Sequence, residues 1–320
     1  MKRIKLIQVL HNFSRNFSVN TKNEAKSKFT SDPFDQFGPV LNSNIYKKNA
    51  ATSRSSPRKL VKSEPELKQQ KMKPQKIVTE HGSLPSFLNP SRITEPDSVG
   101  ETPGEILRIP YEHNHPSVSK ILSATMSEES RAVLARWERD KISLLGEDGF
   151  KKYKSDMFNR GKTLHSILET FLETRTLPRV GEIEDQVSKR HIVSLSQMIH
   201  GVSQPLAIES CVVHEELGYS GILDCVALIN NTITLIDWKT SERVKQSKES
   251  LYDNPFQLAA YIGALNNDPR YHQLGNISHG AVVVVYNSGY PAMCHTFSEK
   301  QLDKYWRLWC QRLDLFKSLR

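Results

Sequence analysis

Residues 219–240 read YSGILDCVALINNTITLIDWKT. Two runs of apolar and β-branched residues flank the pair Asn230-Asn231, and asparagine is one of the few residues besides glycine that tolerate the positive φ of a two-residue hairpin turn. The stretch therefore predicts a β-hairpin. A turn at these two asparagines sets the pairing register so that Asp224 lies directly opposite Asp237.

Two opposed carboxylates need a partner. Directly opposed side chains have Cβ atoms about 4.5–5.5 Å apart, where two like charges destabilise a sheet. Mg²⁺ relieves that repulsion, because it prefers carboxylate oxygens and takes its remaining ligands from water and phosphate. Side chains alternate along a strand, so Lys239 projects to the same face as Asp237, whereas Trp238 points to the opposite face. Two carboxylates and a lysine around a metal suit phosphodiester hydrolysis. The plain alternative is a surface hairpin in which Asp and Lys only alternate with apolar residues.

Two helical segments carry polar pairs that are one turn apart. His165 and Glu169 share a face of a helix expected from residue 162 to about 173, and Gln257 and Tyr261 share a face of a helix expected over residues 254–265. Taken alone, a helical histidine is more often a packing or surface residue, and the second pair is typical of core and rim. The two pairs support an active site only because they occur together with the hairpin.

Four short motifs occur together and in a fixed order. They read Gly161-Lys-Thr-Leu-His165, Gly221-Ile-Leu-Asp224, Asp237-Trp-Lys-Thr240 and Gln257-Leu-Ala-Ala-Tyr261. Each motif is weak by itself, but the set resembles the RecB-like branch of the PD-(D/E)XK nuclease superfamily. From about Pro116 to the C-terminus, the chain looks most like the mitochondrial exonucleases of that branch.

This resemblance implies an activity and a cofactor. It implies an exonuclease that hydrolyses phosphodiester bonds of single-stranded DNA at free ends, needs Mg²⁺ or Mn²⁺, and processes flap DNA or displaced strands during mitochondrial DNA replication. The expected partners are single-stranded DNA, flap DNA and mitochondrial replication proteins, and the expected state is a monomer.

The resemblance also implies roles for individual residues. By the family pattern the metal ligands are His165, Asp224, Asp237 and the backbone carbonyl of Trp238. Lys239 is the catalytic lysine. The supporting residues are Gln257, Tyr261 and Glu209, of which Glu209, on the strand before the hairpin, ranks only as an auxiliary acid.

The remaining patterns predict an α/β fold. Helical spacing covers residues 117–160, with Ser127 as an N-cap and a stop at Gly146, and continues at 162–173 and 185–200. Strand spacing follows at 205–216, 219–229, 232–240 and 279–286, with a helix at 254–265 and a closing helix that opens at Ser298. This order predicts a mixed central β-sheet flanked by helices, as in PD-(D/E)XK nucleases, with an added N-terminal helical region.

The net charge of +9 is unevenly distributed. Residues 1–80 contain 17 Lys and Arg against 6 Asp and Glu, which leaves 27 against 29 for residues 81–320. The basic pI therefore says little about what the folded part binds. Basic residues between 117 and 156 form either a strand-binding surface or a solvated face, among them Lys120, Arg131, Arg136, Arg139, Lys151, Lys152 and Lys154.

The N-terminal tract has the composition of a targeting segment. Residues 1–20 contain four basic residues and no acid, with apolar residues available for one helical face. We interpret them as a presequence for the mitochondrial matrix, cleaved after Phe17; a disordered basic tail is the alternative. Residues 21–110 lack periodic apolar spacing and are expected to be a disordered linker, and residues 111–320 to be the nuclease domain.

Several function classes are disfavoured. The most apolar run, residues 281–286, has the length of a strand, so no membrane-spanning segment is expected. The four cysteines lack the close spacing of zinc or redox motifs and are expected to be reduced. Two rivals remain: a catalytically inactive nuclease fold that only binds DNA, which predicts loss of a motif residue, and a metallohydrolase acting on nucleotides or small phosphoesters.

Overall fold

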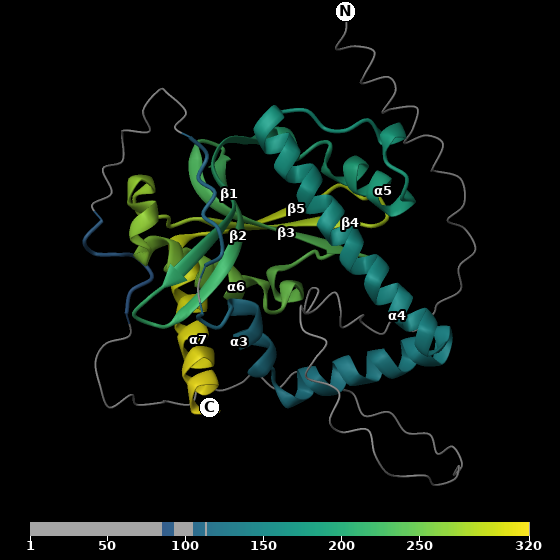
Figure 1. Ribbon diagram of the computed structural model, residues 1–320, viewed down its shortest axis with the longest axis horizontal. Helices are drawn as coiled ribbons and strands as arrows, with labels where there is room; N and C mark the ends of the chain where they lie inside the picture. Colours follow the sequence, from purple (N-terminus) through teal and green to yellow (C-terminus); the bar gives the residue numbers. More distant parts are fainter. Residues whose placement is uncertain (1–84, 93–104, 113, 320) are drawn as a thin grey trace, which may run out of the picture. The chain divides into compact units, whose positions relative to one another are not determined.

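The computed structural model describes residues 85–92, 105–112 and 114–319 (Figure 1). The expected presequence and most of the expected linker lie outside these residues. Within them, no helix is both long enough and apolar enough to cross a membrane.

A five-stranded sheet forms the centre, with the strand order β1-β2-β3-β4-β5. The strands are β1 (Val202–His214), β2 (Tyr219–Ile229), β3 (Thr232–Ser241), β4 (Gly280–Tyr286) and β5 (Met293–Phe297). Neighbours pair antiparallel except for β3 and β4, which are parallel because a helix crosses over between them. The strand β5 was not predicted from the sequence, since it has only five residues and weak alternation.

The predicted hairpin and its register are confirmed. Asn230 and Asn231 have φ angles of 51° and 64°, as a two-residue turn of this kind requires. The ladder then runs from Ile229↔Thr232 to Cys225↔Ile236. The next step of this register is Asp224 with Asp237, at the end of the hairpin.

In the described residues, five α-helices flank the sheet: α3 (Val118–Ala124), α4 (Glu128–Thr174), α5 (Gln186–Leu195), α6 (Asn254–Asn267) and α7 (Glu299–Ser318). The α4 backbone breaks at Gly146 (φ 71°), where the sequence predicted a stop, and its N-cap is Ser127 as predicted. The expectation that a separate helix begins at residue 162 is wrong. The helix continues through Gly161, because one glycine weakens a helix by about 1 kcal/mol relative to alanine and does not by itself end it.

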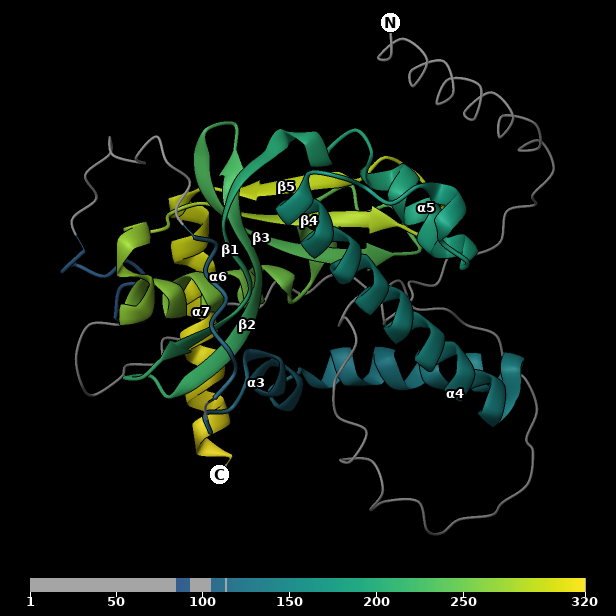
Figure 2. The ribbon, with the colours of Figure 1, turned by 45° about the horizontal axis from the view of Figure 1, so that its top comes forward.

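The helices cover the two faces of the sheet with separate apolar cores. Side chains of α3, α6 and α7 pack with Val282 and Val284 of β4 on one face. Side chains of α4 and α5 pack with Val283 and Val285 on the other, and Trp238 belongs to this second core (Figures 1 and 2). The prediction that Trp238 points away from the face of Asp237 and Lys239, into a packed layer, is therefore confirmed.

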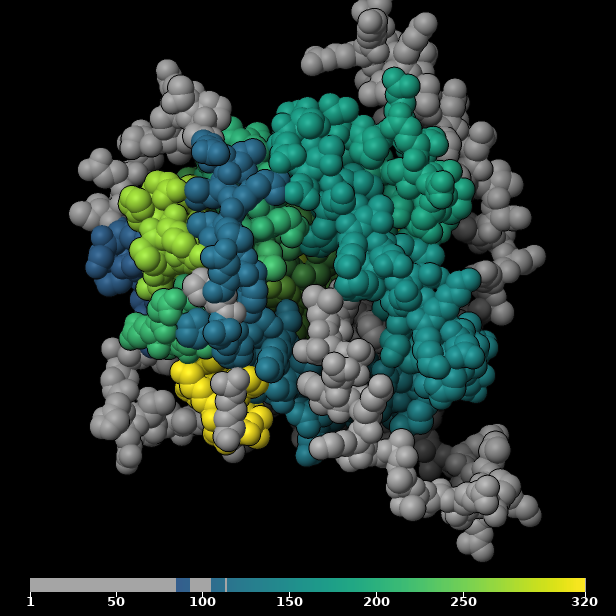
Figure 3. All heavy atoms as spheres, viewed as in Figure 1, coloured from purple at the N-terminus to yellow at the C-terminus, as the bar shows by residue number. Residues whose placement is uncertain are grey.

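Two short pieces of the expected linker pack on the domain. Leu107 exchanges backbone hydrogen bonds with β1, through Leu206 O (2.9 Å) and Ile208 N (3.1 Å), and Figure 3 shows this segment in blue on the surface. Phe87 is buried at 3% exposure, and Trp306 Nε1 donates to Pro85 O (2.7 Å). The packed part of the chain therefore starts before residue 111. An isolated aromatic in a polar stretch gives no periodic signal, so the sequence did not predict this contact.

Candidate active site

The open end of the hairpin brings three charged side chains together. Asp237 is fully buried, and its Oδ1 accepts a hydrogen bond from Lys239 Nζ at 2.8 Å. Asp224 accepts at Oδ2 from the backbone N–H of Trp238 at 2.7 Å. The predicted shared face of Asp237 and Lys239 is thus a direct contact. The backbone of Trp238 joins the site through its N–H, and its carbonyl remains a candidate ligand.

His165 reaches the same place from α4. Its Nδ1 lies 3.0 Å from Glu209 Oε1 and 3.8 Å from Asp224 Oδ1. One ligand atom from each of these three residues lies within 4.8 Å of the other two. Glu169, one turn further along the helix, instead pairs with Arg108 at 2.6 Å and takes no part in the cluster.

Glu209 has a more central position than the sequence suggested. It sits on β1 between the pairs Ile208↔Cys225 and Ser210↔Leu223, which puts it opposite Asp224. Its φ of 42° is rare for a residue other than glycine, and such strain often accompanies functional sites. The only signal that could have raised its rank was a lone acid in an apolar strand next to the hairpin.

Asp237 has an open coordination position. Its Oδ2 is buried and has no hydrogen-bond partner among the described residues, and a buried carboxylate oxygen without a donor is costly. Burial raises the pKa of Asp237, Lys239 opposes the shift, and the neighbouring charge of Asp224 adds to it. A cation beside this oxygen would remove the cost. The donor set of carboxylates with one imidazole fits a hard divalent ion such as Mg²⁺ or Mn²⁺.

The cluster carries excess negative charge. Burial lowers the pKa of His165, but the carboxylates of Asp224 and Glu209 outweigh burial and raise this pKa to about 9. Burial likewise lowers the pKa of Lys239, and Asp237 and Asp224 reverse the effect, so this pKa is raised and the ammonium stays charged. Even with both cations charged, three carboxylates leave the site net negative. It therefore attracts a further cation.

The α6 pair lines the same site. Gln257 Nε2 donates to Tyr261 OH at 2.9 Å, and the side chain of Tyr261 is buried. Burial raises the pKa of Tyr261, and the charges of Asp237 and Asp224 add to the shift, which places the phenol near both carboxylates. A Cβ at Gly221 would collide with the Tyr261 ring, which explains why a glycine opens the motif that ends at Asp224.

A comparison with known families matches residues 122–313 to the PD-(D/E)XK nuclease superfamily. The chain belongs to this superfamily. Both the family and the fold predicted from the motifs are therefore confirmed. In this nuclease, Asp224 of the Gly-x-x-Asp motif meets Asp237 and Lys239 of the Asp-x-Lys motif at the hairpin end, together with His165 of the helical motif.

Individual proteins with similar sequences are also nucleases by name. The chain is 38% identical over 229 residues to mitochondrial genome maintenance exonuclease 1 of Homo sapiens, covering 71% of this chain and 65% of the human protein. For the mouse protein of the same name, identity is 39% over 242 residues, covering 75% and 69% of the two chains. For the Xenopus tropicalis protein it is 37% over 202 residues, covering 63% and 57%. The match thus spans less than two thirds of the human relative.

Proposed function

We propose that this nuclease is a divalent-metal-dependent exonuclease that hydrolyses single-stranded DNA from free ends, including flaps and displaced strands in mitochondrial DNA replication. The observation that carries the proposal is the convergence of His165, Glu209 and Asp224 beside the buried pair Asp237–Lys239. The names of the relatives support the exonuclease activity and the mitochondrial setting.

The metal-binding role is assigned to four side chains. His165, Glu209, Asp224 and Asp237 would hold Mg²⁺ or Mn²⁺, with the carbonyl of Trp238 as a further candidate. When bound, such an ion polarises a phosphate oxygen and lowers the pKa of bound water. The hydrogen bond from the Trp238 N–H orients the Asp224 carboxylate, and Gln257 and Tyr261 support the same wall of the site.

Lys239 has a separate role. Its ammonium stays charged and is fixed by Asp237, so it can stabilise negative charge that develops on the phosphate, or hold the attacking water. Substitution of Lys239 by alanine should therefore lower turnover by about 10²-fold or more. Binding of single-stranded DNA in Ca²⁺ should change little, because one contact among many supplies a small share of the affinity. A variant that keeps its turnover but binds DNA poorly would make Lys239 a backbone anchor.

The substrate is tested with end-labelled oligonucleotides. The purified protein should degrade a linear single strand in Mg²⁺ or Mn²⁺ and leave it intact in excess chelator. A covalently closed circle of the same sequence should resist, because it offers no end. Strands blocked at the 5′ or the 3′ end report the polarity. Cleavage of the circle at the rate of the linear strand would refute an exonuclease, and cleavage of mononucleotides alone would indicate a phosphoesterase for small substrates.

We also propose that residues 1–20 direct the chain to the mitochondrial matrix, that residues 21–110 are chiefly a linker, and that residues 111–320 carry the activity. The charge pattern of the tract supports the first assignment. Deletion of residues 1–20 should disperse the protein from mitochondria and leave its activity in vitro intact. Import of the truncated chain would refute the targeting role. The proposed monomer is checked by sedimentation, and mitochondrial replication proteins remain proposed partners.

A further inference from the structure

One glycine in α4 has no structural reason to be glycine. Gly161 lies inside the helix with ordinary helical backbone, and a Cβ built on it meets no heavy atom within 4 Å. Glycine weakens a helix interior relative to alanine, because it loses more freedom on folding. Alanine would therefore fit here and stabilise the helix.

The other glycines of the described α-helices each have a local reason. Gly146 has a φ of 71°, which side chains rarely adopt. A Cβ at Gly149 would lie 3.1 Å from Leu145 Cβ, and one at Gly263 would collide with the Trp306 ring. Among the glycines with helical backbone in the described α-helices, only Gly161 has open space where a side chain would begin.

The open space borders the metal-binding cluster. Gly161 precedes His165 by one helical turn, so the two share a face of α4. Phe158, also on this side of the helix, is half-exposed and belongs to neither apolar core of the described residues. Gly161 and Phe158 are both only partly buried, so this face of the helix is partly open to solvent.

The charge of this helical stretch indicates what fills the space. Residues 151–162 carry a single acid, Asp156, against five basic residues: Lys151, Lys152, Lys154, Arg160 and Lys162. Such an excess of positive charge attracts a polyanion. The sugar–phosphate backbone of nucleic acid is the polyanion that the proposed activity brings to this cluster.

We propose that Gly161 is a positioning residue that leaves room for the sugar–phosphate backbone of a DNA strand as its scissile phosphate reaches the metal cluster. This inference rests on the proposed function. It predicts that added side-chain volume at residue 161 excludes the strand and leaves the ion and the fold in place.

The test is a size series, Gly161→Ala and Gly161→Leu, in the full-length protein. The Ala variant should melt about 2–4 °C higher, as expected for glycine replaced in a helix interior of a domain of this size. Its kcat/KM on single-stranded DNA should fall about tenfold, and that of the Leu variant further, with a higher KM. Mn²⁺ affinity should stay unchanged. The matched control is Gly181→Ala, which adds the same methyl group into open space on the 3₁₀ turn Val180–Glu182.

The possible results distinguish a failure of the role proposed for Gly161 from a failure of the proposed nuclease function. A wild-type protein that does not cleave single-stranded DNA refutes the proposed function. If the wild type cleaves and the folded Ala and Leu variants cleave within twofold of it, the role of Gly161 is refuted. A loss of Mn²⁺ affinity in the folded variants would also overturn it, because the substitution would then act on the ion site. Loss of DNA cleavage that grows with side-chain size, at constant Mn²⁺ affinity, supports it.

Discussion

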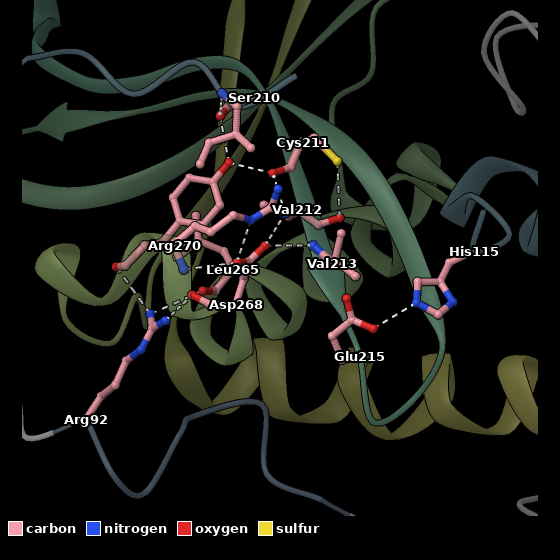
Figure 4. A network of polar contacts seen from close by, with 12 residues as sticks. Arg92, His115, Ser210, Cys211, Val212, Val213, Glu215, Leu265, Asp268 and Arg270 are labelled. Carbon is pink, nitrogen blue, oxygen red and sulfur yellow. Dashed lines mark hydrogen bonds and ion pairs between the residues drawn. The ribbon is translucent and has the colours of Figure 1, made fainter. Parts of the chain in front are cut away.

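Two buried aspartates in this fold have nearly the same exposure and opposite surroundings. Asp237 in β3 is 0% exposed, and Asp268, just after α6, is 2% exposed. Asp268 Oδ1 accepts from the backbone N–H and the Nε of Arg270, and its Oδ2 accepts from Arg270 Nη2 (2.6 Å) and Val213 N (3.0 Å) (Figure 4). Asp237 has Lys239 on Oδ1 and, within the part of the chain that the structure describes, no partner on Oδ2.

The difference separates a structural acid from one suited to bind a ligand. Every oxygen of Asp268 is satisfied within the chain, so its charge ties α6, β1 and η5 (Pro269–Leu274) together. Arg92 extends this network, because its guanidinium donates to Asp268 O and to Leu265 O (3.1 Å), which anchors residues 85–92 (Figure 4). Asp237 keeps an unused oxygen beside two other carboxylates. Matched substitutions of the two aspartates should therefore have different consequences.

The largest expected effect is on activity at the hairpin. Asp237→Asn should lower cleavage by about 10³-fold or more, since it removes an anionic ligand from a preorganised site. Its metal-free stability should hold or rise, because a buried carboxylate whose pKa is raised no longer needs to ionise. Chemical denaturation beside a nuclease assay measures both. Activity near that of the wild type would contradict the assignment of Asp237.

The substitution Asp224→Ala tests the second aspartate of the hairpin by nuclease activity and chemical denaturation. It should abolish cleavage as well, but with a stability loss of about 1–3 kcal/mol, because the Trp238 N–H loses its acceptor.

The reverse pattern is expected for Asp268→Asn. The substitution removes the charge of buried Asp268 from hydrogen bonds with Arg270, which is half-exposed, and should lower the free energy of unfolding by about 1.5–3 kcal/mol. Turnover per folded molecule should stay within twofold of the wild type, since no candidate site residue touches this network. A large loss of turnover at full stability would show that the two aspartates are coupled.

A smaller effect concerns acid stability. His214 is buried and lies against Trp306, and burial, aided by Lys317, lowers the pKa of His214 to about 4. In the unfolded chain this histidine titrates near 6.5. The unfolded state therefore binds a proton first as the pH falls below about 6.5, and the folded state loses up to about 3 kcal/mol by pH 4. His214→Gln should flatten this loss of stability, whereas His279→Gln, at an exposed position, should not. Parallel acid-unfolding curves for the wild type and His214→Gln would refute the assignment.

The parts of the site that follow from local rules were predictable. The turn at Asn230-Asn231 fixes the register of β2 and β3, and a strand period of two places Lys239 beside Asp237. The importance of Glu209 depends on the pairing of β1 with β2. The register of this pair shifts between Ser203 and Ala207, so the residue opposite Glu209 could not be predicted from local rules. The docking of Phe87 and the continuity of α4 through Gly161 depend on tertiary packing, which outweighs local preference.

Titration with Mn²⁺ followed by electron paramagnetic resonance measures whether His165, Glu209, Asp224 and Asp237 form one divalent-metal site. The wild type and Asp268→Asn should bind Mn²⁺ with the same affinity. Asp224→Asn and Asp237→Asn should each bind at least about tenfold more weakly, a difference of about 1.4 kcal/mol. Lys239→Ala should bind as tightly as the wild type or more tightly, because a positive charge beside the ion is gone. Equal Mn²⁺ affinity in the wild type and both hairpin variants would contradict the account.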